Sequence, residues 1–367
     1  MKYKATYNFS SLVLLFLAVL FTIVSCKKAM EMPDKVDPVS ENSVLFNPPS
    51  YFPEPLYDFS QNPLTKEKVD LGKMLFYDPI LSGDSTIACS NCHQPFAAFS
   101  HLSHAISHGI DRKTGIRNTP GLYNLAWMPN FMLDGGIVHL DVQPLAPINN
   151  PVEMGSNLAD ALKALNKNAD YRKKFKEAWN VDEIGSEQML KSLSQFMLTI
   201  VSCNSKYDKF LQGKAELTGE ELEGLTIVKQ KCAPCHGGEL FTDFSIRNIG
   251  MDSTAGDITD LGKETITRLE TDRRKFRVPS LRNFELTGPY MHNGITSSFN
   301  GVMARHDTLV QDVPNLDPIM ITNGIPGIRL TRNERDKIYV FLLTLTDNTI
   351  STNPAFLTPF DHYAPDH

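Results

Sequence analysis

The chain has 367 residues and a net charge of −6, from 36 basic and 42 acidic side chains. This acidic balance comes without any basic run, which argues against nucleic acid as a partner. The length is enough for two domains of ordinary size, and six cysteines are enough to make their spacing informative.

The N-terminal segment has the pattern of an export signal. Lys2 and Lys4 precede an apolar run over residues 12–24, which is shorter than the roughly 20 residues that cross a bilayer. We therefore predict a removable signal peptide over residues 1–25. Cys26 directly after the apolar run predicts a lipoprotein-type anchor on a membrane, whereas an ordinary signal cleavage with an incidental Cys26 is the alternative. Without residues 1–25 the chain keeps 34 basic and 42 acidic side chains, a net charge of −8.

The rest of the chain has the periodicity of helices. Apolar residues recur at helical spacing over 158–165, 189–200 and 338–345, which predicts a helix at each place. Thr218 with Glu221 and Thr331 with Glu334 have the spacing of capping boxes, which mark helix starts. No stretch of useful length alternates with a period of two, so we expect an all-α fold.

Two copies of one motif occur in the chain: Cys89-Ser-Asn-Cys92-His93 and Cys232-Ala-Pro-Cys235-His236. C-x-x-C-H is the covalent attachment signal of c-type haem. Two thiols one helical turn apart add to the two vinyl groups on one haem edge, and the adjacent histidine becomes an axial ligand of the iron. One copy could begin a zinc ribbon, but two copies with the histidine in place predict two covalently bound haems c. Attachment of c-type haem outside the cytoplasm agrees with export.

The spacing of the motifs predicts the domain organisation. We expect two cytochrome c-like helical domains, each with one haem, over residues 61–212 and 213–350. Residues 26–60 are rich in proline, serine and acidic side chains and are predicted to be a flexible tether. Residues 351–367 are assigned to a C-terminal tail.

Further sequence blocks surround the two motifs, in the order 71–76, 107–109, 117–120, 134–136, 143–154, 278–283 and 287–294. With these blocks, residues 64–345 resemble the bacterial di-haem cytochrome c peroxidase family, which includes the MauG-like enzymes. The resemblance implies an enzyme of the periplasm or cell envelope that reduces hydrogen peroxide to water. Electrons would come from a small cytochrome or copper protein, enter at the C-terminal haem and pass to the N-terminal haem, where peroxide binds. A homodimer is left open.

Two rival functions remain at this point. A MauG-like oxidase would use the same two haems to oxidise residues of a partner protein. A non-catalytic di-haem electron-transfer cytochrome would need no acid–base residue beside either haem.

The resemblance also assigns roles to individual residues. It makes His93 and His236 the proximal iron ligands, Glu153 the catalytic acid–base residue and Gln143 its hydrogen-bonding support. Cleavage of the O–O bond needs a proton moved to the leaving oxygen, which a carboxylate above the iron can relay. Considered alone, Glu153 would more often be a solvated surface acid.

His108 matches the family's removable distal ligand on the first haem, which leaves the iron when the other haem is reduced. His101 and His104 lie nearby, so a merely polar, histidine-rich loop is the alternative. A His-Gly pair in a mobile loop suits a ligand that must come and go.

The distal ligand of the second haem departs from the family pattern of methionine or tyrosine. The matching position is His306, with Met303 one helical turn earlier as the alternative ligand; binding by neither is the third option. Imidazole is the stronger ligand, and a bis-histidine haem has a lower potential than one with histidine and methionine.

Two further positions follow from the resemblance. Many relatives have a tryptophan between the haems where this chain has Leu133, with Trp127 close by in the sequence. A calcium ion is expected from the oxygens of Asn118, Thr287 and Pro289, since calcium prefers such ligands. The alternative for Asn118 is a turn residue.

Overall fold

The computed structural model describes residues 45–102, 104–251 and 259–360. The predicted signal peptide, the Cys26 anchor and residues 26–44 of the predicted tether lie outside the described residues. In the described part of the chain, no helix has the length and apolar character needed to cross a membrane.

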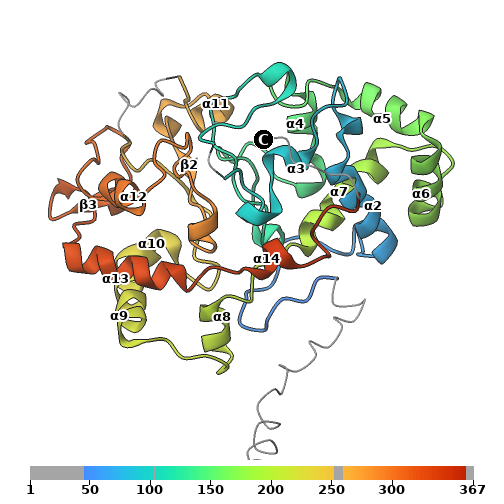
Figure 1. Cartoon of the computed structure of the whole chain (residues 1–367). Coiled ribbons are helices and arrows are strands. Elements are labelled where there is room, and N and C mark those ends of the chain that lie inside the picture. The colour runs from blue at the N-terminus through green and yellow to red at the C-terminus, as the bar shows by residue number, and fades with distance from the viewer. Residues whose placement is uncertain (1–44, 103, 252–258, 361–367) are drawn as a thin grey trace, which may run out of the picture. The chain divides into compact units, whose positions relative to one another are not determined.

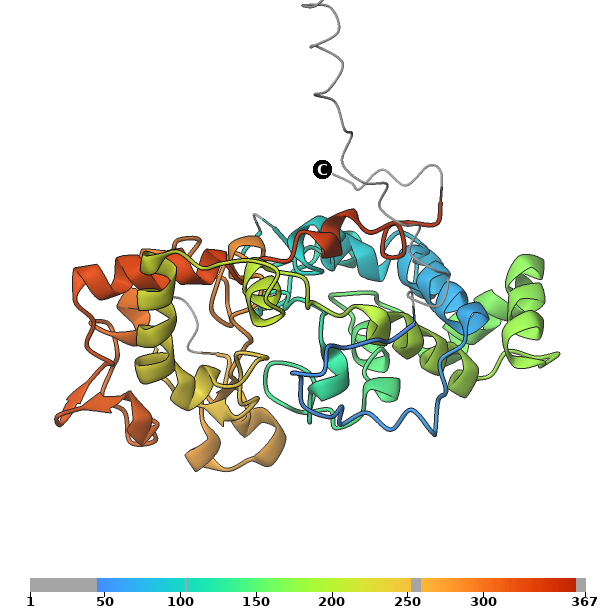
Figure 2. The same ribbon diagram turned by 90° about the horizontal axis from the view of Figure 1, so that it is seen from below.

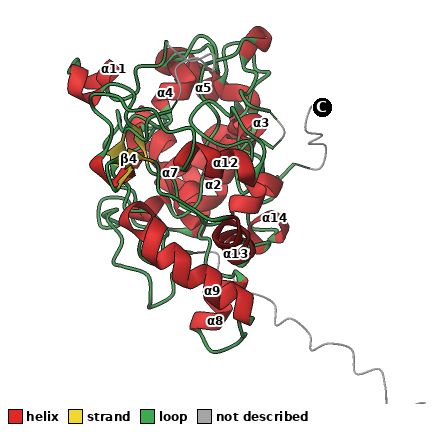
Figure 3. Ribbon diagram, turned by 90° about the vertical axis from the view of Figure 1, so that its left-hand side faces the viewer, coloured by secondary structure: helices red, strands yellow, loops and turns green. Residues whose placement is uncertain are grey.

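Helices and irregular loops make up almost all of the described chain (Figure 3). The N-terminal half contains α2 (Lys66–Tyr77), α3 (Cys89–Cys92), α4 (Leu145–Asn149), α5 (Leu158–Lys167), α6 (Ala169–Trp179) and α7 (Ser186–Thr199). The C-terminal half contains α8 (Lys206–Leu211), α9 (Gly219–Ile227), α10 (Ala233–His236), α11 (Glu264–Thr267), α12 (Phe299–His306), α13 (Arg332–Leu343) and α14 (Thr349–Thr352). The strands are β1 (Ile246–Arg247) antiparallel to β2 (Phe276–Arg277), and β3 (Ile321–Thr322) antiparallel to β4 (Ile325–Pro326).

Single turns of other helix types occur along the rest of the described chain. A π-helical turn, Val228–Cys232, joins α9 to α10. Turns of 3₁₀ helix lie at Pro79–Leu81, Pro95–Ala97, Ile110–Arg112, Leu125–Trp127, Leu140–Val142, Glu270–Asp272, Phe284–Leu286 and Pro318–Met320. The helices predicted over 158–165, 189–200 and 338–345 are confirmed as α5, α7 and α13. The capping boxes of Thr218 with Glu221 and Thr331 with Glu334 are also confirmed.

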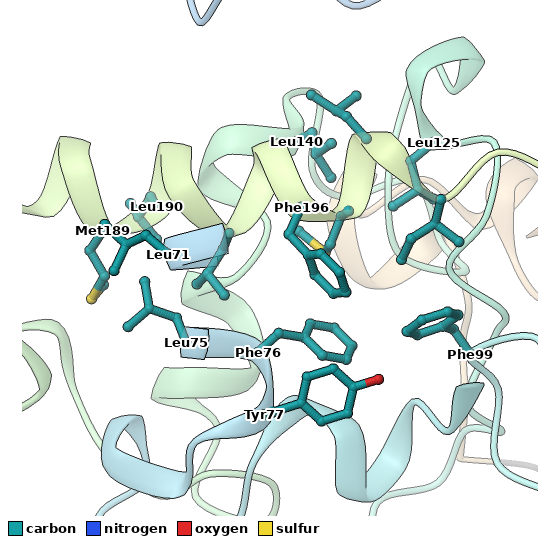
Figure 4. Packing of buried hydrophobic residues seen from close by; sticks show 14 of the residues in the cluster. Leu71, Leu75, Phe76, Tyr77, Phe99, Leu125, Leu140, Met189, Leu190 and Phe196 are labelled. Atoms are coloured by element: carbon teal, nitrogen blue, oxygen red, sulfur yellow. The ribbon is translucent and has the colours of Figure 1, made fainter. Parts of the chain in front are cut away.

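The two halves of the body have separate hydrophobic clusters. In Figure 1, α2 and α5 to α7 lie on one side and α9, α10, α12 and α13 on the other. The N-terminal cluster packs α2 against α7, with Phe76, Phe99 and Phe196 at its centre (Figure 4). The C-terminal cluster packs α9 against α13, with Phe341 fully buried. Each haem motif therefore follows a helix that is packed into its own core.

A glycine allows close helix crossing in each half. A Cβ on Gly72 would lie 1.8 Å from the Ser192 carbonyl oxygen of α7, and one on Gly224 would lie 2.1 Å from the Lys337 carbonyl oxygen of α13. No side chain fits at these separations, so both crossings depend on glycine. The two halves thus repeat one arrangement: a glycine-containing helix, a haem motif, and a later helix that crosses the first.

Part of the predicted tether is instead folded. Phe52 is buried in the N-terminal cluster, and the indole Nε1 of Trp127 donates to the Pro53 carbonyl oxygen at 2.7 Å. The tether prediction is therefore wrong for residues 45–60, because their aromatic side chains bury apolar surface despite the polar composition around them.

The end of the described chain returns to the N-terminal half. Ile350 and Phe356 are buried in the N-terminal cluster, and the Tyr77 hydroxyl donates to the Phe356 carbonyl oxygen at 2.5 Å. Figure 2 shows this red segment lying along the blue and cyan elements. Residues 351–360, assigned to the tail, thus pack on the other half of the body.

A fully buried ion pair lies where the two halves meet. Both amino groups of Arg282 donate to the Asp208 carboxylate at 2.9 Å, and both side chains have 0% exposure. The Arg282 Nε donates to the Glu239 carbonyl oxygen at 2.8 Å, while Tyr51 donates its hydroxyl to Asp208 at 2.9 Å. Burial alone would raise the pKa of Asp208, but the charge and hydrogen bonds of Arg282 and those of Ser205 lower it overall.

Replacement of Asp208 by asparagine should destabilise the protein by about 3–5 kcal/mol, because Arg282 would keep a buried charge without its counter-ion. Equilibrium unfolding in denaturant measures this loss. Asp70→Asn is the matched control, since its pair with Lys66 is 52% and 49% exposed and is expected to contribute about 0–1 kcal/mol. Equal losses in the two variants would contradict the prediction.

The same pair should make stability depend on pH. The pKa of Asp208 is lowered in the folded state, so its contribution is complete above the unfolded value of about 3.9. That contribution is lost as the pH falls through the lower folded value. Wild type should therefore lose more stability on acidification than Asp208→Asn.

Candidate functional site

The first haem motif forms α3, and its histidine is held from behind. The His93 Nδ1 lies 2.8 Å from the Phe99 carbonyl oxygen, an acceptor that requires Nδ1 to carry the proton. Burial lowers the pKa of His93 to about 4, so the ring is neutral at neutral pH. Its Nε2 lone pair is then available to a metal, the arrangement found for metal-binding histidines in general.

The second motif has the same anchoring. The His236 Nδ1 lies 3.0 Å from the Pro279 carbonyl oxygen. Burial, and next the charge of His306, lower the pKa of His236 to about 4. Both motif histidines therefore present a neutral Nε2, although nothing in their immediate sequence specifies the carbonyl that holds them.

The motif cysteines are buried thiols. Burial raises the pKa of Cys89 and of Cys232 to about 12, so both are neutral thiols in the absence of a bound group. Structural zinc needs four ligands, and no group of three or more His, Cys, Asp or Glu residues among the described residues is arranged to hold a metal ion. These residues fit a covalently attached haem and not a zinc ribbon.

A cavity lies directly beside the second motif. Its walls include Cys232, Cys235 and His236 of the motif and also Met303 and His306 of α12. The His306 Nδ1 is 2.9 Å from the Val302 carbonyl oxygen, so this ring also presents its Nε2. Both candidate distal ligands therefore reach the cavity.

Glu153 lies near the first motif in a partly buried position. Burial raises the pKa of Glu153. The Asn150 side chain has a smaller, opposite effect on this pKa, since its Nδ2 donates to the Glu153 Oε1 at 2.7 Å. Burial raises the pKa of Cys92, and the charge of Glu153 raises it further. The Glu153 carboxylate therefore lies near the first motif. Asn150 was missed by the sequence analysis, where only its place in the 143–154 block drew attention to it.

Gln143 and Glu153 lie at the two ends of one compact turn. Pro144 caps α4 and Pro147 lies within that helix, and the backbone N–H of Glu153 donates to the Asn150 carbonyl oxygen at 3.1 Å. The Gln143 side chain donates to the Met132 sulfur at 3.6 Å. One chain segment therefore carries both residues, with the Gln143 amide directed at Met132; their joint role stays a prediction.

The His108 loop lies against the Glu153 segment. The N–H of Ile110 donates to the Glu153 carbonyl oxygen at 2.8 Å, and the Cys92 sulfur lies 3.9 Å from the His108 carbonyl oxygen. The His108 ring is exposed and lies 5.6 Å from that of His104, which lies 4.6 Å from that of His101. All three histidines therefore gather beside the first motif.

The predicted calcium residues Asn118, Thr287 and Pro289 all line the cavity. Asn118 already makes hydrogen bonds to both halves. Its side chain donates to the Ala105 carbonyl oxygen at 2.9 Å, and its backbone N–H donates to the His292 carbonyl oxygen at 2.7 Å. Calcium at this place stays a prediction.

Trp127 does not take the place of the missing tryptophan. It is buried between Phe46 and Phe52 in the N-terminal cluster. Leu133, in contrast, lines the cavity, and its carbonyl oxygen accepts from the N–H of Arg277 at 2.7 Å.

Comparison with known proteins agrees with this arrangement. Residues 66–216 match the family described as di-haem cytochrome c peroxidase. The methylamine utilization protein MauG of Methylorubrum extorquens is 32% identical over 318 residues, which cover 85% of each chain. The chain belongs to the di-haem cytochrome c peroxidase family. The cytochrome c551 peroxidase of Nitrosomonas europaea, also 32% identical, matches over 83% of this chain and 87% of its own length.

Solved structures of this di-haem peroxidase family share the fold. A MauG-like protein associated with microbial copper homeostasis is 30% identical with a TM-score of 0.77, covering 86% of this chain and 99% of that one. A diheme peroxidase from Burkholderia thailandensis, 22% identical, has a TM-score of 0.69 over 81% of this chain and 91% of its own. The predicted family, the helical di-haem peroxidase fold and the class of haem-dependent oxidoreductase are therefore confirmed.

Gly109 makes the contact between the His108 loop and the Glu153 segment possible. A Cβ at Gly109 would lie 2.3 Å from the Val152 carbonyl oxygen and 2.5 Å from that of Glu153. Gly109→Ala should therefore push the loop away and cost about 1–3 kcal/mol of unfolding free energy. Equilibrium unfolding, with amide exchange at Ile110, measures both effects.

Gly115→Ala is the matched control for this change, because a Cβ there meets nothing within 4 Å. It should leave both readouts near wild type. If Gly109→Ala behaved like Gly115→Ala, the loop contact would not be as tight as the structure has it.

Proposed function

We propose that the protein is an exported cytochrome c peroxidase that reduces one hydrogen peroxide to two waters, with two electrons and two protons. The electrons come from a small cytochrome or copper protein. The observation that carries the proposal is the difference between the two motifs: among the described residues, only the first motif has a partly buried carboxyl of raised pKa, Glu153, beside it. A carboxyl with that property is suited to acid–base work.

The domain assignment in this proposal is two cytochrome c-like helical domains, residues 61–212 and 213–350. The repeated glycine crossings of α2 with α7 and α9 with α13 support it. The thioether sites are Cys89 and Cys92 for one haem and Cys232 and Cys235 for the other, with His93 and His236 as proximal ligands. The haem at the first motif, when bound, supplies the iron at which the peroxide O–O bond is cleaved.

Glu153 handles the proton in the proposed reaction. Its ionised carboxylate accepts a proton from the near oxygen of peroxide and returns it to the far oxygen, which leaves as water. Asn150 holds Oε1 of that carboxylate at 2.7 Å, so one oxygen is fixed and the other is free to face the substrate. Gln143 supports the site by hydrogen bonding.

His108 is the proposed removable ligand of the first iron. Its exposed ring and its place in a loop that rests on the Glu153 segment support this role. Departure of the ring would open the position that peroxide needs, next to the residue that moves its proton.

His306 is the proposed distal ligand of the second haem. Its Nδ1 is held by the Val302 carbonyl oxygen, as those of His93 and His236 are held by theirs. Met303 remains the alternative. Two imidazoles would give the second haem a lower potential than a histidine and methionine pair.

The protein is proposed to lie in the periplasm or cell envelope and to be held to a membrane by Cys26. Calcium at Asn118, Thr287 and Pro289 is retained as a proposal that rests on the family alone.

A MauG-like oxidase is the second candidate, since a MauG protein is as similar to this chain as a cytochrome c551 peroxidase is. Peroxide consumption by the protein with a reduced small cytochrome separates the two. Turnover of the cytochrome supports the peroxidase; its absence after pre-reduction would exclude it.

Glu153→Gln should lower kcat/KM for peroxide by about 10²- to 10⁴-fold, the usual contribution of a positioned acid–base group. Glu183→Gln, an exposed acid on the same half, is the control and should keep wild-type turnover. A non-catalytic electron-transfer protein predicts no difference between the two variants.

The activity of wild type should also fall with acid. Burial raises the pKa of Glu153, and the carboxylate must be ionised to accept a proton. The rate should therefore decline as the pH falls through the pKa of Glu153, which lies above the ordinary glutamate value of about 4.3. Glu153→Gln should not show this acidic decline in its pH–rate profile.

His306→Ala should remove the low-spin signal of the second haem from the electron paramagnetic resonance spectrum of the oxidised protein. Met303→Leu, one turn away on α12, is the control and should leave the signal unchanged. The reverse pattern would make Met303 the ligand, and two unchanged spectra would exclude both.

A further inference from the structure

The cavity beside the second motif has basic side chains in its wall. Lys231 and Arg247 both line it, but their charges are already compensated. Lys231 pairs with Glu334 at 2.6 Å, and Arg247 pairs with Asp243 at 2.7 Å and Asp317 at 2.8 Å. These two cations therefore need no further anion.

Arg277 lines the same cavity without such compensation. No carboxylate of a described residue forms an ion pair with it, and its Nε makes a single long hydrogen bond, 3.3 Å, to the Met132 carbonyl oxygen. Burial lowers the pKa of Arg277 to about 10. The side chain is partly exposed and lines the cavity, so an anion held there would supply the counter-ion that the described protein residues do not.

The position of Arg277 ties it to the second haem motif. It ends β2, two residues before Pro279, whose carbonyl oxygen holds His236 at 3.0 Å. The same short segment therefore carries both the carbonyl group that orients the motif histidine and the Arg277 cation. The backbone N–H of Arg277 also donates to the Leu133 carbonyl oxygen at 2.7 Å. This hydrogen bond fixes the backbone from which the Arg277 side chain extends.

A c-type haem brings the matching anion. It is attached through its vinyl groups and keeps two propionate carboxylates, and the planar fork of arginine fits a carboxylate with two parallel hydrogen bonds. We infer that Arg277 binds a propionate of the haem attached at Cys232 and Cys235, and that it sets the reduction potential of that haem. This inference rests on the proposed function, because it requires the second motif to carry haem.

The expected electrostatic effect has a definite sign. Reduction removes one positive charge from the iron, so a nearby cation favours the reduced state and raises the potential. Arg277 also holds the propionate in its ionised form by favouring the charged carboxylate. Its removal should lower the potential and allow the propionate to take up a proton in an accessible pH range.

The test is a redox titration of the full protein with two haems, followed at several pH values by optical and electron paramagnetic resonance spectra. Arg277→Gln should lower the reduction equilibrium constant of the second haem about tenfold, which is about 59 mV for one electron. It should also make that potential depend on pH. Arg273→Gln is the control: Arg273 is 49% exposed and lies 3.8 Å from Glu264, and its loss should change the constant less than twofold.

Arg277→Lys gives a second reading that does not depend on losing the charge. It should keep most of the potential but shift the propionate bending band in the resonance Raman spectrum, because a single ammonium replaces the fork. If Arg277→Gln does not fold with two haems, this band decides: an unchanged band overturns the inference.

Two other results would overturn the inference. One is an unchanged potential of the second haem in Arg277→Gln, and the other is a shift confined to the first haem. The haem content of wild type separates these failures from failure of the proposed function. Fewer than two haems per chain would sink both, whereas two haems with an unaffected potential would sink only the role of Arg277.

Discussion

The buried pair of Arg282 and Asp208 is the constraint on which the arrangement of the second motif depends. Both side chains have 0% exposure, so neither charge can be left without the other. The Tyr123 hydroxyl donates to the Arg282 carbonyl oxygen at 2.6 Å, and the Arg282 guanidinium lies 4.8 Å from the centre of the Phe52 ring. The pair therefore holds residues of both halves at one point. It fixes the segment that begins at Pro279, whose carbonyl oxygen orients His236.

The two motifs are alike on the proximal side and different on the other. Each histidine gives its Nδ1 proton to a backbone carbonyl oxygen, which prepares it as a metal ligand. The second motif shares one cavity with Met303 and His306 of α12. Beside the first is the Glu153 turn, with the His108 loop lying on its backbone. This difference in surroundings is the physical basis for assigning chemistry to one site and electron supply to the other.

Local patterns predicted the regular parts of the fold well. The apolar periodicity of α5, α7 and α13 and the two capping boxes depend on residues within a few positions of each other, so the sequence was sufficient for them. Composition did not predict the packing of residues 45–60, because Phe52 and its aromatic neighbours contact Trp127, which is distant in the sequence. The hydrogen bond between Trp127 and Pro53, for example, joins residues 74 positions apart. Asn150 and Arg277 were missed for a related reason: their roles come from what faces them in space.

The sequence by itself determined that the chain carries two C-x-x-C-H motifs and folds as helices, since motif spacing and helical period are local properties of the chain. Its further sequence blocks resemble the di-haem cytochrome c peroxidases, the family that the comparisons then confirmed. Only the tertiary structure decided which carbonyl orients each motif histidine, that Glu153 lies in a setting that raises its pKa, and that Arg277 faces the second cavity without a carboxylate partner among the described residues. These depend on burial and on contacts between distant segments. Spacing along the chain carries no information about either.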